Sequence, residues 1–258
     1  MPLPTPFKGG FIKMDFHVHT PVSYCYDDNM EPELGLHTQP EHIVQAALDA
    51  GLDAMVVSDH NAVTNIRPMQ AAAADTGLVI FPAIELTTTG GHLLAIFDPE
   101  DDVDRMARLL DRLEFPESES GNGSYSTHFW LDDCARAVVD FGGMAIAAHI
   151  DREPRGFVAG YFERDIKKRI HGSDFLSGLE ITDPRGKPDW EQGKVRHYTK
   201  PYAVVQGSDA HGHTEVGRRP THLYVTELTL KGFRDAFAHY QDFVKFPKEL
   251  ELETALTD

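Results

Sequence analysis

Short apolar segments that end directly in His, Asp or Glu recur along this chain, and they constrain its fold more than any other feature. Four examples lie at residues 11–19 (FIKMDFHVH), 52–60 (LDAMVVSDH), 144–150 (MAIAAHI) and 203–211 (AVVQGSDAH). Segments with apolar residues at helical spacing lie between them. This alternation predicts a parallel sheet with crossover helices. With six or seven such units in 258 residues, we expect an α/β fold closed into a TIM-like barrel.

The other expected elements follow the same pattern. Further strands are predicted at residues 78–85, 92–98, 177–183 and 221–228, and helices at 40–51, 69–77 and 230–240. Residues 100–142 read as mainly helical, interrupted by the turn-rich segment PESESGNGSYS, and residues 20–40 read as a loop. There is no repeat and no long linker, so we expect one domain over residues 1–258.

Composition excludes several functional classes. The chain has 24 Lys and Arg against 41 Asp and Glu, a net charge of −17, which disfavours broad binding to nucleic acid or to an anionic membrane. No apolar run is long enough to span a membrane, and the N-terminal residues do not resemble a secretory signal. Two cysteines, Cys25 and Cys134, cannot form a disulfide framework, so we expect a cytoplasmic protein. The unusual count is 14 His.

The histidines and carboxylates concentrate where a barrel builds its active site, at the carboxyl ends of the strands. His17 and His19 alternate at the end of the first strand, so both imidazoles can face one cation. The further strand-end positions of ligand type are Asp59, His60, Glu85, His92, His149, Asp209 and His211. These are too many ligands for one ion, so the pattern predicts a multinuclear metal site.

The ligand types indicate the metal and the chemistry. Imidazole with carboxylate, without a cluster of thiolates, suits Zn, Mn or Fe. Glu85 and Asp209 are the candidates for a carboxylate that bridges two cations. Neighbouring divalent cations generate hydroxide at neutral pH and stabilise both oxygens of an in-line displacement, which suits phosphoester hydrolysis.

The ordered motifs HVHT, DHN, Glu85, His92, AAHI and SDAH resemble those of the polymerase and histidinol phosphatase (PHP) family, from about residue 11 to about residue 240. The resemblance implies a distorted (βα)7 barrel with two or three divalent metal ions and phosphoesterase activity. It implies that Glu85 joins a first and a second metal site. The implied ligand sets are His17, His19, Glu85 and Asp209 for the first metal, Glu85, His92 and His149 for the second, and His60 and His211 for the third.

One loop departs from the family pattern. The family usually has an Asp five or six residues after the second His of the first motif, and this chain has Tyr24 and Cys25 there. A Cys25 thiolate could serve as the third metal's ligand. Alternatively, Asp27 or Asp28 could supply a carboxylate, or the third site could be empty.

Arginines that follow two strand ends are candidates for binding phosphate, because the planar guanidinium can hold two oxygens. Arg152 and Arg155 come shortly after one strand, and Arg218 and Arg219 after another. The alternative is that they are surface residues of an acidic protein. His213 is a candidate proton donor to the leaving oxygen, or simply an exposed residue.

Glu180, at another strand end, could support the metal ligands from outside, and Asp59 either orients a neighbouring imidazole or fixes the turn after its strand. The predicted function is hydrolysis of a phosphomonoester, nucleotide or short oligonucleotide by attack of a metal-bridging hydroxide. The alternatives are an amidohydrolase-type metal hydrolase, which commonly needs a bridging Lys that no strand end here carries, and a non-catalytic metal-binding module acting with a partner. Segments such as GSDAHGHTEVGRRPT most resemble PHP modules found alone or joined to ATPase domains. No GxxxxGK[ST] motif occurs in this chain, so an ATPase partner would be a separate polypeptide.

Overall fold

A nine-stranded sheet organises the computed structural model, which describes residues 8–31 and 36–255. The strands are β1 (Gly10–Val18), β4 (Ala54–Val57), β5 (Val79–Thr88), β6 (Gly91–Ile96), β7 (Met144–Ala147), β8 (Gly178–Glu180), β9 (Ala203–Val205), β10 (Thr221–Val225) and β11 (Val244–Lys245). Their order in the sheet is β11-β10-β1-β4-β5-β6-β7-β8-β9. A separate pair, β2 (Asn29–Glu31) and β3 (Leu36–His37), follows the first strand.

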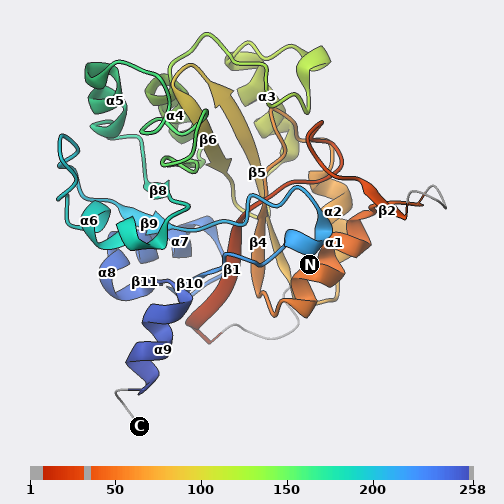
Figure 1. Cartoon of the computed structure of the whole chain (residues 1–258). Helices are drawn as coiled ribbons and strands as arrows, with labels where there is room; N and C mark the ends of the chain where they lie inside the picture. The colour runs from red at the N-terminus through yellow and green to blue at the C-terminus, as the bar shows by residue number, and fades with distance from the viewer. Residues whose placement is uncertain (1–7, 32–35, 256–258) are drawn as a thin grey trace.

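The sheet curls so that the segment after β9 pairs with the end of β1. Val18 and Ala210 form a parallel bridge, and the His19 backbone N–H donates to the Ala210 carbonyl at 3.0 Å. The result is a nearly closed barrel of mixed α/β type (Figure 1). The predicted fold class, a distorted TIM-like barrel, is therefore confirmed.

The expectation of an all-parallel sheet is wrong. Strands β1, β4 and β5 are parallel, as are β7, β8 and β9, but β6 is antiparallel to both of its neighbours and β10 is antiparallel to β1. Only Thr89 and Gly90 separate β5 from β6, which is a hairpin length and far too short for a crossover. This hairpin places His92, near the start of β6, beside the end of β5, with Thr87 and His92 paired.

Most helices lie outside the sheet and cover it with their apolar faces, whereas the last one extends away from it at the bottom of the view (Figure 1). The helices are α1 (Pro40–Asp49), α2 (Ile66–Ala73), α3 (Val103–Arg112), α4 (Leu131–Asp140), α5 (Arg164–His171), α6 (Lys187–Glu191), α7 (Leu230–Ala238), α8 (Tyr240–Phe243) and α9 (Pro247–Ala255). Helix α2 begins three residues before the predicted start, because Ile66, Met69 and Ala73 share one buried face. No helix among the described residues has the length and apolarity of a membrane span.

An irregularity in β1 directs the side chains of His17 and His19 into the barrel. Ile12, Met14 and Phe16 belong to a core cluster shared with the other strands and α7, whereas Val18 packs in a different cluster with residues of α1. Between Asp15 and Val18 the pairing with β4 shifts register. Such a shift changes which side chains face inward, and β-bulges often re-aim residues beside active sites. It explains why one strand supplies apolar residues at one end and imidazoles at the other.

Candidate metal centre

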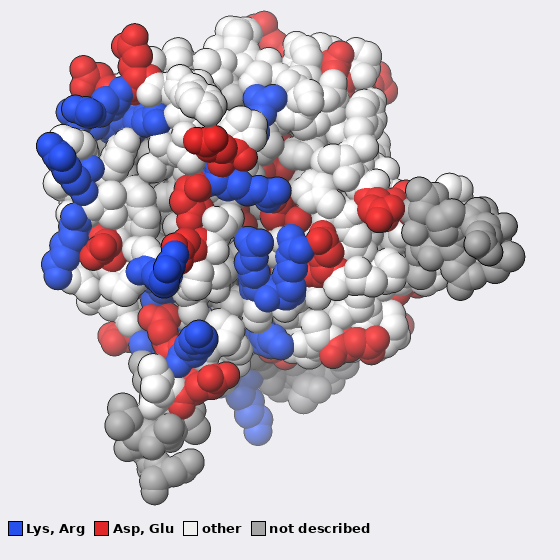
Figure 2. Space-filling model, in the orientation of Figure 1, with Lys and Arg blue, Asp and Glu red and all other residues white. Residues whose placement is uncertain are grey.

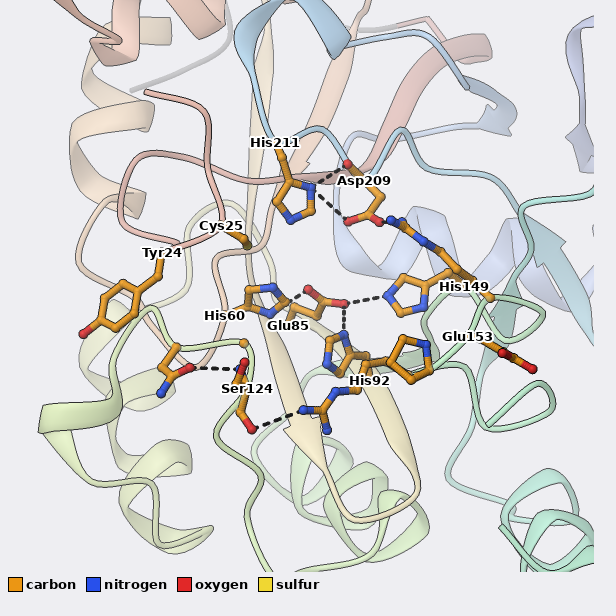
Figure 3. Close-up of a pocket in the computed structure, with 15 residues that line it drawn as sticks. Tyr24, Cys25, His60, Glu85, His92, Ser124, His149, Glu153, Asp209 and His211 are labelled. Atoms are coloured by element: carbon orange, nitrogen blue, oxygen red, sulfur yellow. Dashed lines mark hydrogen bonds and ion pairs between the residues drawn. The ribbon is translucent and has the colours of Figure 1, made fainter. Parts of the chain in front are cut away.

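The carboxylate of Glu85, fully buried near the end of β5, lies at the centre of the site (Figure 3). Its Oε1 atom lies 2.7 Å from Nδ1 of His92 and 3.0 Å from Nε2 of His149. His92 comes from the start of β6 and His149 follows β7. One carboxylate oxygen therefore faces two imidazoles, one from the adjacent strand β6 and one from the segment after β7.

The second oxygen of Glu85 faces a different group. Its Oε2 atom lies 2.9 Å from Nδ1 of His60 and 3.3 Å from Nε2 of both His17 and His19. Asp209 completes this group, with Oδ1 at 3.6 Å from His17 Nε2 and 3.3 Å from His19 Nε2. The structure thus brings together residues that are up to 192 positions apart, between His17 and Asp209.

A third group contains imidazoles alone. Ligand atoms of His19, His60 and His211 all lie within 4.8 Å of one another. The ring centroid of His19 lies 4.6 Å from that of His60 and 4.3 Å from that of His211. The Nδ1 atom of His211 lies 2.9 Å from the backbone carbonyl oxygen of Asp209, which fixes this ring at the edge of the cluster.

These spacings fit divalent cations. Ligand atoms about 2.1 Å from a metal ion lie about 3.0–3.4 Å from one another, close to the distances around Glu85. Although Glu85 Oε2 and His60 Nδ1 lie 2.9 Å apart, neither atom forms a hydrogen bond with a described residue, and neither does the buried Nδ1 of His149. Buried polar atoms rarely stay unpartnered, and a bound cation would satisfy the first two directly. The donor set of imidazole and carboxylate is the one that transition metals prefer.

The electrostatics of the cluster favour cations. Burial would raise the pKa of Glu85, but the imidazoles of His92, His60 and His17 outweigh it and hold the pKa well below its ordinary value. The pKa of Asp209 is also lowered, because His17 and His19 outweigh its burial. Both carboxylates are therefore ionised at neutral pH, which places two negative charges in a buried site.

The imidazoles respond to those charges in two ways. Burial lowers the pKa of His92 to about 4, so that ring is neutral at pH 7 and has a lone pair available for a metal ion. At His17, His60 and His149, burial lowers the pKa, but the surrounding hydrogen bonds and negative charges, with Glu85 first among them, together outweigh burial and raise the pKa of each. An environment that attracts protons to these rings also attracts a divalent cation.

Glu180, a candidate support in the sequence, contacts two of the candidate ligand residues. Its carboxylate is buried at the end of β8, and Oε2 lies 3.0 Å from Nδ1 of His17. The same oxygen accepts the backbone N–H of His149 at 3.0 Å. A carboxylate on the far nitrogen of an imidazole fixes the ring and leaves Nε2 free for a metal.

A second support runs through a residue that the sequence did not reveal. The hydroxyl of Ser23 lies 3.0 Å from Nδ1 of His19 and donates to Oδ1 of Asp59 at 2.7 Å. Asp59 also accepts the backbone N–H and the hydroxyl of Thr20, at 2.8 and 2.6 Å. A serine four residues after the second histidine carries no pattern of its own, so only the folded loop shows this role.

Three residues of the site have an unusual backbone conformation. Asn61, His149 and Asp209 have φ angles of 50°, 28° and 49°, in a region that residues other than glycine seldom occupy. The Asn61 side chain compensates by accepting the Thr87 backbone N–H at 2.9 Å and donating to the carbonyl of Tyr125 at 3.2 Å. Positive φ at three site residues is the pattern expected where function requires a strained conformation.

A cavity of about 510 Å³ opens over the cluster. Figure 3 shows the labelled residues around it, with Tyr24 pointing away from Glu85 at one side. The lining residues are Tyr24, Cys25, His60, Glu85, His92, Asn122, Gly123, Ser124, His149, Arg152, Glu153, Pro154, Arg155, Asp209 and His211. The cavity walls come from the loop after β1, the segment after α3 and the segment after β7.

The predicted phosphate-binding residues divide into two groups. Arg152 and Arg155 line the cavity; Arg152 binds the carboxylate of Asp209, and Arg155 donates to the Ser124 carbonyl at 3.2 Å. Arg218 instead donates to the Ser208 carbonyl and to Glu215, and it does not line the cavity. Arg218 therefore holds the loop after β9.

His213 begins a short 3-10 helix at residues His213–Glu215 and does not line the cavity either. In this structure it is a partly exposed loop residue, so the geometry gives no support to its predicted role as a proton donor.

The three candidate ligand residues in the loop after β1 also differ in where their side chains lie. Cys25 is exposed and lines the cavity beside His60 and His211. Asp27 is exposed and outside the cavity lining, and its backbone N–H donates to the His211 carbonyl at 2.6 Å. Asp28 accepts the Thr38 backbone N–H at 2.9 Å and pairs with His37 at 3.0 Å, so its carboxylate serves the β2–β3 segment.

Comparison with solved structures shows which proteins share this fold. Endonuclease Q of Pyrococcus furiosus, described as a lesion-specific endonuclease, matches with a TM-score of 0.66 at 16% identity over 88% of this chain. Endonuclease Q bound to a 27-mer duplex with an abasic lesion at its active site gives 0.62 over 89%. A two-domain protein of Bacteroides vulgatus, described as containing a predicted PHP-like metal-dependent phosphoesterase, gives 0.58 at 18% identity over 91%.

An amidohydrolase of Chromobacterium violaceum matches with a TM-score of 0.51 at 17% identity over 79% of this chain. No protein-family model and no curated protein matches the sequence. At identities of 16–18% these likenesses show a shared fold. The chain spans 56% of the length of endonuclease Q and 64% of the Bacteroides protein.

Proposed function

We propose that this PHP-like barrel is a metal-dependent phosphoesterase that acts on a phosphomonoester, a nucleotide or a short oligonucleotide. The observation that carries the proposal is the position of Glu85, whose two carboxylate oxygens face two separate groups of imidazoles at 2.7–3.3 Å. A buried carboxylate in that position is suited to join two cations. Two adjacent cations form the two-metal sites of phosphatases and nucleases, where they stabilise both the attacking and the leaving oxygen.

The residues of the chain have distinct tasks in this proposal. His17, His19, Glu85 and Asp209 would hold one cation, and Glu85 with His92 and His149 would hold another. Zn, Mn or Fe ions at these positions would supply hydroxide at neutral pH and neutralise charge on the phosphoryl oxygens.

The cavity walls bind and orient the substrate. Arg155 lines the cavity, and its guanidinium provides donors for the phosphoryl oxygens of a bound ester. Arg152 carries a second guanidinium into the cavity beside Asp209. Both positive charges would stabilise the negative charge that develops on phosphate in the transition state.

The size of the cavity and the surface charge favour a small substrate. About 510 Å³ accommodates a mononucleotide or a short segment of one strand. The net charge is −17, and Figure 2 shows acidic and basic side chains interspersed on one face, without a continuous basic surface. Tight binding to long duplex DNA requires many Lys and Arg contacts to phosphates.

The alternative of an amidohydrolase has one observation in its favour, the structural likeness to the Chromobacterium enzyme. Such barrels commonly use a lysine that bridges two metals. Among the described residues the only buried lysine is Lys187, which pairs with Glu191 and Glu249 and does not line the cavity. Glu85 stands where a bridging group is required, so the phosphoesterase is the better-supported function.

We propose a cytoplasmic location, because two cysteines in 258 residues cannot form a disulfide framework. A separate ATPase partner stays a prediction.

A panel of substrates tests the proposal. Metal-loaded protein should hydrolyse p-nitrophenyl phosphate, nucleoside monophosphates or dinucleotides, and excess chelator should abolish the activity. Arg155→Ala should raise KM for that substrate roughly tenfold or more through the loss of a charge-assisted hydrogen bond. Arg112→Ala, which changes an arginine outside the cavity lining, is the matched control. Hydrolysis of N-acyl substrates with no phosphoester activity would refute the proposal.

A further inference from the structure

An aromatic side chain lies at the rim of the cavity, on the loop after β1. Tyr24 lines the cavity, 69% of its surface is exposed, and Figure 3 shows its ring at the outer side, away from Glu85. Other tyrosines pack against rings of the chain itself, namely Tyr125, Tyr198, Tyr202 and Tyr224. In the part of the chain that the structure describes, no ring and no cation stacks on Tyr24. This ring is therefore available to a molecule in the cavity.

Contacts with the backbone of the neighbouring segment hold this ring in place. The Tyr24 N–H donates to the Gly121 carbonyl at 2.9 Å, and the Gly121 N–H donates to the His60 carbonyl at 2.9 Å. A Cβ on Gly121 would lie 3.0 Å from Cε1 and 3.1 Å from Cδ1 of Tyr24, so one edge of the ring packs on the glycine. Gly121 has a φ of +84°, a conformation that favours glycine. The ring is thus positioned before a ligand binds, and a preorganised contact loses less entropy on binding.

The cavity wall beside Tyr24 offers few free hydrogen-bonding side chains. Gly123 has no side chain, and Asn122 uses its amide within the wall itself. The Nδ2 atom of Asn122 donates to Glu119 Oε2 at 2.6 Å, and its Oδ1 atom accepts the Ser124 N–H at 2.9 Å. A ligand group rich in hydroxyls would lose hydrogen bonds to water here without replacing them, whereas a planar aromatic group stacks on the tyrosine ring. This side of the cavity is therefore suited to a flat ring.

The remainder of the cavity is suited to phosphate. Glu85 and the imidazoles around it form the proposed metal centre, and Arg155 brings a guanidinium to the same cavity. A ligand that extends from the metal centre to Tyr24 carries a phosphate at one end and a planar ring at the other, which is the form of a nucleotide. The cavity of about 510 Å³ is within the range of sites that hold small ligands. Stacking on one aromatic ring strengthens the binding of a base roughly 5- to 150-fold, without requiring further cations from a chain whose net charge is −17.

We propose that Tyr24 stacks on the base of a nucleotide whose phosphate binds at the metal centre. This inference rests on the proposed function and deepens it, because it selects nucleotides, free or at the end of a short strand, from among the phosphoesters. Tyr24 contacts the base and takes no part in bond cleavage at phosphorus. A phenylalanine would serve as well at this position, whereas a side chain without a ring would not.

A comparison of two ligands that differ only in the base tests the inference. Adenosine 5′-monophosphate and ribose 5-phosphate carry the same phosphoester, and their inhibition constants are measured on metal-loaded protein, with the fastest-reacting ester of the substrate panel as the reporter. The wild type should bind the nucleotide roughly tenfold or more tightly than the sugar phosphate. Tyr24→Ala should bring that ratio close to one, and Tyr24→Phe should keep it. Tyr161→Ala is the matched control and should keep the ratio, because it makes the same change at an exposed tyrosine outside the cavity lining.

The ratio of the two inhibition constants isolates stacking, because a loss of metal or of phosphate binding weakens both ligands alike. Equal inhibition constants in the wild type, or a wild-type ratio in Tyr24→Ala, would overturn the role of Tyr24 and leave the phosphoesterase standing. Metal-loaded protein that hydrolyses no ester of the panel would overturn the proposed function, and this inference with it. Since Tyr24 is an exposed loop residue, its substitution is not expected to prevent folding.

Discussion

Replacing Glu180 by glutamine should weaken metal binding although Glu180 is not a proposed ligand. Its carboxylate oxygen lies 3.0 Å from Nδ1 of His17 and 3.0 Å from the backbone N of His149. Glutamine can keep its one oxygen on both donors, but it removes the negative charge beside His17 and places its NH2 group where the second carboxylate oxygen lies, 3.3 Å from the same Nδ1. A hydrogen bond to a charged group contributes about 1–2 kcal/mol more than one to a neutral group, which corresponds to roughly 5- to 30-fold in the metal dissociation constant.

The assay is a competition titration of the metal against a chelator of known affinity, with thermal unfolding measured on the same samples. Glu191→Gln is the matched control, because it makes the same chemical change at a buried carboxylate that pairs with Lys187 at 3.0 Å. We expect the control to lower the melting temperature and leave metal affinity unchanged. If Glu180→Gln binds metal as tightly as the wild type, the supporting role of Glu180 is wrong.

Three further predictions concern the site and the core. Glu85→Gln should lose at least one bound ion and most of the hydrolytic activity while the circular dichroism spectrum stays native, and a variant with the wild-type rate would contradict the bridging role. Gly123→Ala should weaken metal binding roughly tenfold, because its Cβ would lie 2.5 Å from the His60 ring, and unchanged affinity would show that this loop yields. Burial, with a smaller effect of Lys200, lowers the pKa of His171 to about 4. The unfolded chain binds a proton at His171 at a higher pH than the folded chain does. The free energy of unfolding should therefore fall by about 3 kcal/mol as the pH drops from about 6.5 to 4. His171→Phe should make the free energy of unfolding depend less on pH, as measured by urea titrations of protein treated with a chelator to remove metal. The same pH dependence in the variant and the wild type would refute this prediction.

The strand-end residues could be predicted because their signal is local. An apolar run ending in HVH or SDAH shows both the strand and the direction of the imidazoles, since alternate residues share a face. The antiparallel β6 was missed for an equally local reason, the two-residue connection at Thr89 and Gly90, which the sequence shows but the repeating pattern obscured. That hairpin explains why His92 begins its strand whereas Glu85 lies toward the end of the preceding one.

The supports and the cavity walls were harder to predict because they depend on contacts between distant segments. Ser23 acts between His19 and Asp59 only once the first loop folds over β4. Arg155 and Arg218 looked equivalent in sequence, since each follows a strand end. The loop after β9 turns Arg218 onto the backbone of Ser208, whereas the loop after β7 brings Arg155 into the cavity. A strand end thus predicts proximity to the site but not the direction of a long side chain.

An anomalous-scattering map from crystals grown with Mn or Zn would test the central claim most directly, namely that the two oxygens of Glu85 join two metal ions. We predict one peak between Glu85 Oε1 and the rings of His92 and His149, and a second between Oε2, His17, His19 and Asp209, each about 2.0–2.2 Å from its ligands. A single peak that contacts only one oxygen of Glu85, or no peak within this cluster, would contradict the account.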